Sequence, residues 1–426
     1  MQNGPTFGRV AAPSRNLFPS ENHAKPWRNP GERDRVCAGS PPGHVATSSL
    51  APQHLHAAAA TRKLPAVNDP RSSAPARGAG SNPPNRFERL HLEANADWDP
   101  EQDPLPRTHF LRDRTATILA HNDSPDIGFD TTLNPYRGCE HGCIYCYARP
   151  THEYLGFSSG LDFETRIMVK EDAPELLRRE LSHPRWRPRT IGMSGVTDCY
   201  QPVERRLKLT RRCLEVLAEF RNPVAIVTKN YLITRDLDVL SELARWKAVC
   251  VFVSVTSLDS GLRKVLEPRT SPPPARLAAI RALAQAGVPT GVLVAPIIPG
   301  LTDHEIPSIV AAAAAAGARF GGYEVLRLPH AVAPLFEEWL ARHVPQKKDK
   351  ILNRIRSIRG GKLNHSAFGL RMRGEGIFAD QIARLFEVAS RKAGWQGDEP
   401  ELSSVNFRRP ARAQLELPLA PSARQP

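Results

Sequence analysis

Three cysteines stand close together in the stretch Asn134-Pro-Tyr-Arg-Gly-Cys139-Glu-His-Gly-Cys143-Ile-Tyr-Cys146-Tyr147. Their C-x3-C-x2-C spacing follows directly on a short predicted strand, so one loop can fold all three thiols onto one centre. A structural zinc ion takes four ligands, and His141 or His152 would have to supply the fourth. A [4Fe-4S] cube held by three thiolates keeps one iron open for a substrate or cofactor. The stretch therefore predicts a metal centre, and the count of three thiols favours the cube.

Outward from this stretch, short apolar runs alternate with amphipathic helical patterns. Six runs are predicted to be strands of one sheet: 131–135, 190–193, 224–228, 249–255, 288–298 and 320–326. Helical patterns separate them, for example over 207–220 and 273–286. Six successive strand-then-helix units predict an α/β fold, a parallel sheet curled into a partial (βα)6 barrel with its core over 107–330. Ligands are then expected at the carboxyl ends of the strands.

The segments that flank this core have a different composition. Residues 1–106 hold 16 of the 40 prolines and show no sustained apolar period, which predicts a mostly disordered N-terminal region. Residues 331–400 are predicted to form a small basic helical module, and 401–426 a flexible tail. Within that module, residues 347–373 carry nine Lys and Arg and one acid.

The length, composition and charge of the chain limit its compartment and its partners. The chain has 426 residues, of which 41% are hydrophobic and 24% charged, enough for a sizeable core. No apolar run is long enough to span a membrane and no secretory signal is visible, so we expect a cytoplasmic protein with no membrane association. Seven cysteines, with three of them clustered, fit a reducing compartment better than a disulfide framework. The net charge of +14 favours an acidic partner such as nucleic acid.

The cysteine spacing, with the aromatic Tyr145 before the third cysteine, resembles the signature of the radical S-adenosylmethionine (SAM) superfamily. The resemblance covers residues 126–330 and implies the same partial barrel. It also implies that Cys139, Cys143 and Cys146 ligate a [4Fe-4S] cluster whose open iron binds SAM, with Tyr145 beside the adenine. One electron, from a donor such as flavodoxin or ferredoxin, would cleave SAM to a 5′-deoxyadenosyl radical that abstracts hydrogen from a substrate.

The strand ends are similar to those of the spore photoproduct lyase-like, or DNA repair photolyase-like, group. The second predicted strand runs into Ser194-Gly-Val-Thr197-Asp-Cys199, the third ends at Lys229, and the fourth reaches Ser254. The likeness implies SAM contacts from Thr197, Lys229 and Ser254, and catalytic roles for Tyr147 and Cys199. Lys229 suits the SAM carboxylate and the hydroxyls suit its polar groups. Their alternative roles are a solvated charge and turn residues bonded to their own backbone.

One position departs from the lyase pattern. The lyase has a hydrogen-donating cysteine where this chain has Gly195, so we expect little or no reversal of spore photoproduct. Cys199 lies four residues on and is the alternative donor, although a buried cysteine is more often a small core residue. In the loop after the fourth strand, Glu267 and Arg269 form a predicted charged pair at the barrel mouth that could bind SAM or substrate.

Two substrate classes and one non-enzymatic function remain open. The lyase-like motifs and the basic residues 347–373 favour a nucleic-acid base or lesion, bound as DNA or RNA. Modification of a protein or metabolite is the second possibility. The third is a non-catalytic, metal-stabilised nucleic-acid-binding protein. A salt-dependent affinity for nucleic acid separates the first from the second.

Overall fold

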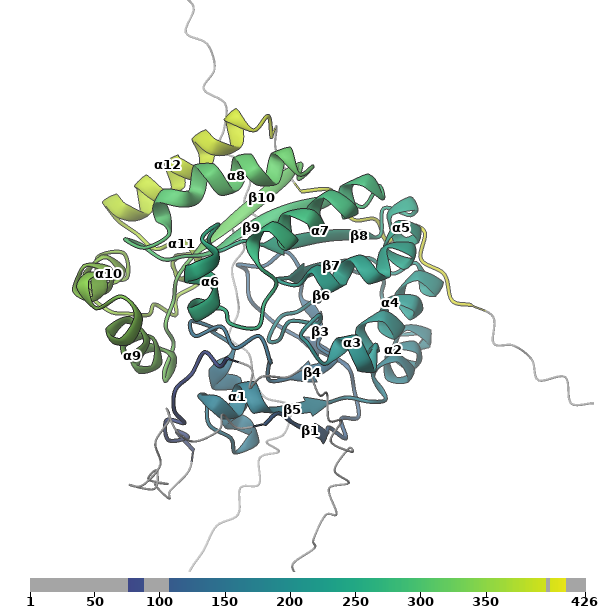
Figure 1. Cartoon of the computed structure of the whole chain (residues 1–426). Helices are drawn as coiled ribbons and strands as arrows, with labels where there is room; N and C mark the ends of the chain where they lie inside the picture. Colours follow the sequence, from purple (N-terminus) through teal and green to yellow (C-terminus); the bar gives the residue numbers. More distant parts are fainter. Residues whose placement is uncertain (1–75, 88–106, 396–398, 411–426) are drawn as a thin grey trace, which may run out of the picture.

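The computed structural model describes residues 76–87, 107–395 and 399–410. Its main sheet has the strand order β10-β9-β8-β7-β6-β3-β2 (Figure 1). The strands are β2 (Leu119–His121), β3 (Thr131–Leu133), β6 (Ile191–Met193), β7 (Val224–Thr228), β8 (Val249–Ser254), β9 (Thr290–Ile297) and β10 (Phe320–Val325). All neighbours pair in parallel except the edge strand β2, which is antiparallel to β3. The six predicted parallel strands are confirmed.

The strands form because their side chains are apolar on both faces. β8 reads Val-Cys-Val-Phe-Val-Ser and is buried at every position. A strand of a parallel sheet is covered on both faces, so its sequence is a continuous apolar run rather than an alternating one. β7 and β9 flank it in the same parallel register.

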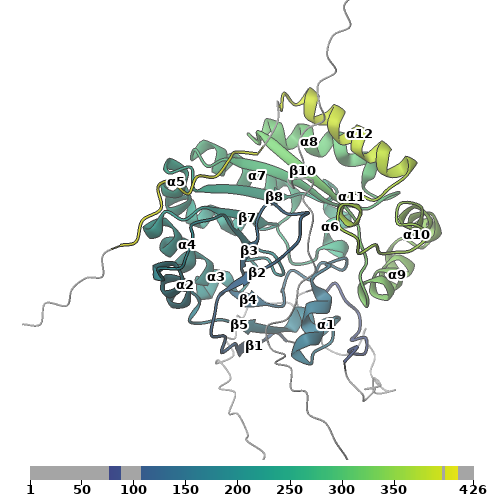
Figure 2. The same cartoon turned by 180° about the vertical axis from the view of Figure 1, so that it is seen from behind.

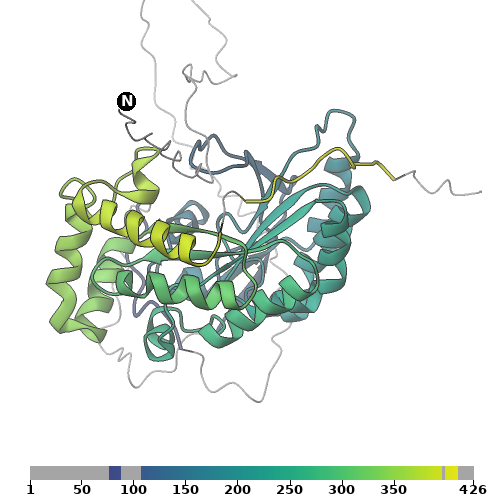
Figure 3. The ribbon, with the colours of Figure 1, turned by 90° about the horizontal axis from the view of Figure 1, so that it is seen from above.

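Helices cover the outer face of this curved sheet (Figure 3). They are α2 (Ala173–Ser182), α4 (Leu209–Phe220), α5 (Leu237–Arg245), α7 (Pro273–Gln285) and α8 (Ile306–Ala315). Two short helices, α3 (Glu204–Leu207) and α6 (Ser260–Leu266), follow β6 and β8. In α4 the apolar residues Cys213, Leu214 and Leu217 recur at helical spacing and are fully buried against the sheet. No helix in the described ranges is long and apolar enough to cross a bilayer.

A second, three-stranded sheet carries the cysteines. It has the order β1-β5-β4, from β1 (His109–Arg112), β5 (Arg166–Val169) and β4 (Tyr136–Arg137). After β4 come the three cysteines, a 3-10 helix (Arg149–Leu155) and α1 (Leu161–Thr165). The Tyr136 hydroxyl donates to Glu204 at 2.5 Å, which ties this sheet to the segment that follows β6. We call residues 138–147 the cysteine loop.

The C-terminal helices share the core of the barrel. They are α9 (Val332–His343), α10 (Lys348–Ser357), α11 (Leu370–Arg373) and α12 (Ile377–Lys392). α12 lies along α8 (Figure 1), and its Ala379 and Ile382 belong to the main hydrophobic cluster. α9 and α10 pack with Leu326, which directly follows β10. The predicted basic helical module thus has no separate core, because its apolar faces are used to cover the barrel.

The barrel is open between its two edge strands. Among the described residues no strand pairing joins β10 to β2. A loop contact bridges this gap, since Asp126 accepts a hydrogen bond from the Gly369 backbone N–H at 2.6 Å and pairs with Arg371. The partial barrel is therefore completed by side chains from the β2–β3 loop and the C-terminal region rather than by backbone pairing.

The flanking segments are described only in part. The predicted disordered region 1–106 lies mostly outside the described residues, but residues 76–87 are described and pack beside α1. The predicted tail begins at 401, yet residues 399–410 follow the barrel surface. The backbone N–H of Ser403 bonds to the Lys247 carbonyl, and that of Arg408 to the Phe220 carbonyl, both at 2.9 Å. Residues 411–426 lie outside the described ranges.

Candidate functional site

The three thiols of the cysteine loop are free and shielded from solvent. Cys139 and Cys143 are each 7% exposed, and Cys146 is partly buried. Gly138 and Gly142 have φ values of 79° and 67°, a left-handed conformation that lets the chain turn tightly around the cysteines. Burial raises the pKa of Cys143 and Cys146. Thiolates at these positions therefore need compensating positive charge, which a bound metal supplies.

The loop suits an iron-sulfur cube better than a single zinc ion. No three His, Cys, Asp or Glu side chains in the described part of the chain converge closely enough to hold one ion. A cube binds each cysteine through a different iron, so it needs no such convergence. Cys139, Cys143 and Cys146 therefore stay the residues predicted to hold the cluster.

The two histidines that could complete a zinc site differ in how many of their ring nitrogens are engaged. His141 has Nδ1 3.3 Å from Asp198 and Nε2 3.1 Å from the Asn230 amide. Burial opposes protonation of His141, but Asp198 and Cys139 outweigh it and raise its pKa to about 10. His152 has Nε2 2.9 Å from the Arg166 carbonyl, and burial lowers its pKa to about 4. His141 is therefore not free to serve as a fourth ligand, whereas His152 Nδ1 is buried without a hydrogen-bond partner.

The segment after β6 holds the cysteine loop in place. Thr197 donates from Oγ1 to the Gly138 carbonyl at 2.7 Å. Gln201 donates to the same carbonyl at 3.2 Å and accepts from the Glu140 backbone N–H at 2.9 Å. Thr197, predicted to contact SAM, is thus also a support of the loop that carries the cysteines.

Asp198 links two strand ends to the cysteine loop. Its carboxylate accepts from the Thr228 hydroxyl and from the Lys229 backbone N–H, both at 2.8 Å, and it faces His141. Burial alone would raise its pKa, but His141 and the hydrogen bonds lower it below the usual value. The sequence predicts no role for Asp198, although its place between Thr197 and Cys199, both predicted site residues, was an available signal.

A buried charged cluster lies on the other side of the loop, centred on Glu267. The carboxylate accepts from the Tyr145 hydroxyl and from Arg276, and Thr256 donates to it at 2.8 Å. Burial acts to raise the pKa of Glu267, but Arg276 and Lys229 lower it to about 2. Of the charges predicted at the barrel mouth, Arg276 from α7 pairs with Glu267, while Arg269 pairs with Glu140 at 3.0 Å.

The structure brings Tyr145 and Lys229 together at this cluster. Lys229 Nζ lies 5.9 Å from the Tyr145 ring centroid, 3.8 Å from Glu267, and donates to the Ala295 carbonyl at 3.0 Å. Ser254 is 2% exposed, and its carbonyl accepts from Arg276 at 3.1 Å. Three residues predicted from three separate segments therefore lie around one buried carboxylate.

The two predicted catalytic residues lie in opposite environments. Tyr147 is 41% exposed, donates to the Gly195 carbonyl at 2.8 Å, and has the Arg327 guanidinium 4.3 Å from its ring centroid. Cys199 is fully buried within the main hydrophobic cluster, and burial raises its pKa well above the ordinary value. Its position favours a core role, whereas Tyr147 is accessible.

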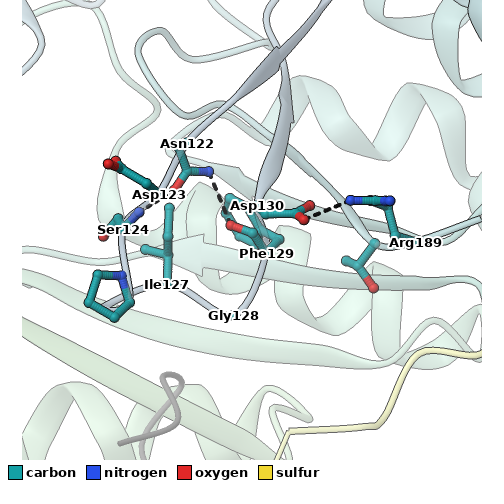
Figure 4. Close-up of a pocket in the computed structure, with 10 residues that line it drawn as sticks. Asn122, Asp123, Ser124, Ile127, Gly128, Phe129, Asp130 and Arg189 are labelled. Atoms are coloured by element: carbon teal, nitrogen blue, oxygen red, sulfur yellow. Dashed lines mark hydrogen bonds and ion pairs between the residues drawn. The ribbon is translucent and has the colours of Figure 1, made fainter. Parts of the chain in front are cut away.

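A hollow of about 520 Å³ lies away from these residues (Figure 4). It is lined by the loop between β2 and β3, including Asn122 and Phe129, and by Arg189, whose guanidinium pairs with Asp130 at 2.7 Å. Asp130 and Arg189 come just before β3 and β6, at the amino ends of the strands. The hollow is therefore not the predicted site.

The fold and the cysteine loop have counterparts among known proteins. The family model described as Radical SAM superfamily matches residues 133–313. Rv2578c of Mycobacterium tuberculosis, named as an uncharacterized protein, is 41% identical over 222 residues, 52% of this chain and 65% of the relative. MJ0683 of Methanocaldococcus jannaschii, also named as uncharacterized, is 30% identical over 178 residues, 42% of this chain and 64% of the relative. The chain thus spans slightly less than two thirds of these relatives.

A solved structure of a spore photoproduct lyase variant shares the fold. Its TM-score is 0.50 at 17% identity, covering 69% of this chain and 82% of the lyase chain. At this identity the likeness concerns the fold alone.

Proposed function

We propose that the chain is an enzyme that cleaves SAM reductively, on the premise that residues 133–313 match the family model described as Radical SAM superfamily. When bound, a [4Fe-4S] cluster with SAM on its open iron supplies the electron that releases a 5′-deoxyadenosyl radical, which abstracts hydrogen from a substrate. Cys139, Cys143 and Cys146 would hold the cluster. The observation that carries the proposal is three free thiols, two buried and one partly buried, on one loop that turns at two glycines beside the strand ends.

The chain's own residues would bind and orient SAM around the buried Glu267. Lys229 is the cation that we expect to bind a SAM carboxylate, since its Nζ donates to the neutral Ala295 carbonyl and its ion pair with Glu267 is long, at 3.8 Å. Tyr145 is held by Glu267, so its ring is fixed for an adenine contact. Thr197 follows β6 and Ser254 ends β8, with β7 between these two strands. Tyr147 is the accessible group for radical or proton transfer.

The test is metal analysis after anaerobic purification. We expect brown protein with about four irons per chain, the content of one cube. Cys139→Ala, Cys143→Ala and Cys146→Ala should each abolish it, whereas Cys250→Ala should not, because Cys250 lies in β8 away from the loop. Reduced protein should convert SAM to 5′-deoxyadenosine and methionine. Stoichiometric zinc with no SAM cleavage would instead support the metal-stabilised binding protein.

For the substrate we propose a nucleic-acid base or lesion. The strand ends are similar to the lyase group, and exposed aromatic rings lie beside cations in two places. Tyr147 is covered by Arg327, and Phe368, 51% exposed, lies 4.5 Å from the Arg371 guanidinium. Aromatic faces next to cations are what single-stranded nucleic acids bind. A protein or metabolite substrate becomes the better proposal if no salt-dependent affinity for DNA or RNA is found.

Within that class we expect little or no spore photoproduct reversal, because Gly195 stands in place of the donor cysteine. The position has room, since a Cβ built on Gly195 would meet its nearest neighbour, Thr132, at 3.4 Å. Gly195→Cys should therefore fold and should raise conversion of dinucleoside spore photoproduct to thymines, measured by chromatography. Efficient reversal by the wild type, abolished by Cys199→Ala, would show that Cys199 is the donor despite its burial.

A further inference from the structure

A short N-terminal segment lies directly against the cysteine loop. Residues 76–87, here called the strap, run beside α1 and toward α9 (Figure 1 and Figure 2). Ala79 is 2% exposed and packs in one apolar cluster with Cys143, Ile144 and Tyr145. The strap therefore covers the side of the loop that carries Cys143 and keeps solvent from it.

The strap reaches the cysteine loop through two glycines. A Cβ built on Gly78 would lie 1.7 Å from the Gly142 carbonyl oxygen, a distance that no packing can accept. A Cβ on Gly142 would lie 2.7 Å from Glu164 Oε2. The two segments can approach this closely only because both positions are glycine and carry no Cβ. The strap thus fixes where the peptide just before Cys143 lies.

Glu164 joins the strap to the loop through a second route. Its carboxylate accepts from the backbone N–H groups of Gly78 at 3.0 Å and Ala79 at 2.8 Å. It also pairs with Arg149, and both side chains are fully buried. Arg149 in turn donates from Nε to the Cys143 carbonyl at 3.0 Å. The strap N–H groups, Glu164, Arg149 and Cys143 form one continuous hydrogen-bonded path.

The rest of the strap is anchored independently of this path. Asn82 exchanges two hydrogen bonds with Asp162, at 2.9 and 3.2 Å. Asn85 donates to the carbonyls of Glu153 and Phe157, at 2.9 and 3.0 Å. The position of the strap is thus set along its whole length, so its contact with the cysteine loop is a built part of the site.

We propose that the strap is a component of the cluster site and that Glu164 is a positioning residue coupling it to the Cys143 side of the cysteine loop. The inference rests on the proposed function, because it concerns how that cluster is held. Hydrogen bonds around the ligands and solvent access set the reduction potential and stability of such clusters. Loosening the strap should therefore change both, with the cysteines themselves intact.

Two variants of the full chain test this by different means. Gly78→Ala keeps every charge and pushes the strap from Gly142, and Glu164→Gln removes the carboxylate that the strap and Arg149 share. The control is Glu338→Gln, a carboxylate on α9 that touches the strap at Ser81, at 3.5 Å, but has no link to the cysteine loop.

The first readout needs no cluster. In metal-free protein, alkylation of Cys143, followed by peptide mass spectrometry, should be several-fold faster in Gly78→Ala and Glu164→Gln than in wild type or Glu338→Gln. The rate at Cys213, fully buried in α4, should stay unchanged and reports that the fold is intact. The second readout is the midpoint potential and the rate of loss of visible absorbance in air, which should both change in the two variants.

The outcomes separate the two proposals. If wild type binds no cluster, the proposed function fails, but the alkylation comparison still decides whether the strap shields Cys143. If both variants keep wild-type alkylation rates and, when loaded, wild-type potential and air stability, the strap is only surface packing and the inference is overturned.

Discussion

The strap (residues 76–87) and the basic segment (residues 347–373) both lie outside the six strand-helix units, but they attach to the barrel in opposite ways. The strap attaches through its backbone, as the N–H groups of Gly78 and Ala79 bond to a buried carboxylate. The basic segment attaches through its side chains, both apolar ones such as the buried Ile351 and charged ones such as Arg354, which pairs with Asp303 at 3.1 Å. A backbone segment can pack in van der Waals contact inside a buried site. A charged side chain stays at the edge of such a site, because burying an unpaired charge is costly.

Some cations of the basic segment are already paired or buried in the fold. Arg354 and Arg371 pair with Asp303 and Asp126, and Arg359 is buried and donates to the carbonyls that end β10. These three cations of the nine therefore serve the fold. The cations available to a polyanion are fewer than their count in the sequence suggests.

The largest expected difference between the two regions is in stability. Arg149→Met leaves the fully buried Glu164 carboxylate without its counter-ion, and should lower the free energy of unfolding by roughly 3–5 kcal/mol, the usual cost of breaking a buried pair. Chemical denaturation of metal-free protein measures it. Arg354→Met is the matched control, because that pair is partly exposed and should cost about 0–1 kcal/mol. Equal losses of unfolding free energy in the two variants would mean that the ion pair beside the strap stabilises the fold no more than the ion pair of the basic segment.

An intermediate effect is expected where the basic segment closes the barrel. Asp126→Ala removes the acceptor of the Gly369 N–H and the partner of Arg371, and should cost about 1.5–3 kcal/mol, as for hydrogen bonds to a charged group. Hydrogen exchange should then speed up in residues 368–373. Asp303→Ala, which frees the half-exposed Arg354, should leave this segment unchanged. If residues 368–373 exchange no faster in Asp126→Ala than in wild type, this segment is held by its apolar contacts alone.

The sequence was sufficient wherever a contact is local or periodic. β7 begins and ends where its apolar run does, and the cysteines act through spacing within one loop. The ion-pair partner of Glu267 is not decided by sequence distance, because the start of α7 brings Arg276 to Glu267 while the nearer Arg269 pairs with Glu140.

The strap could not be predicted for a different physical reason. Its contacts with the cysteine loop are made by Gly78 and Ala79, which carry no polar side chain and follow no helical or strand period. Its low apolar content resembles that of the disordered sequence around it. The feature of the sequence that could have indicated the strap is a run of small residues followed by Asn82 and Asn85. The Asn82 amide donates to Asp162, and the Asn85 amide donates to a backbone carbonyl.

The smallest effect on the protein itself is expected at the lysines that remain. Lys347, Lys350 and Lys362 are exposed, and no acidic partner lies within ion-pair distance of them among the described residues. Replacing all three with Gln should change the free energy of unfolding by no more than about 0.5 kcal/mol each and leave iron content and uncoupled SAM cleavage intact. If they meet phosphates, the slope of log affinity against log salt should fall by roughly 0.7–0.9 for each lost contact.

Binding to single- and double-stranded DNA and RNA across a salt series gives that slope. Arg354→Gln is the control in the same helix, because its charge is already paired with Asp303 and should contribute less than a free lysine. A triple variant with the wild-type slope would show that the exposed cations of this segment are a solvated surface. In that case the comparison with the strap sharpens, since the segment richest in charge would then have no part in binding, and a protein or metabolite substrate would become the better proposal.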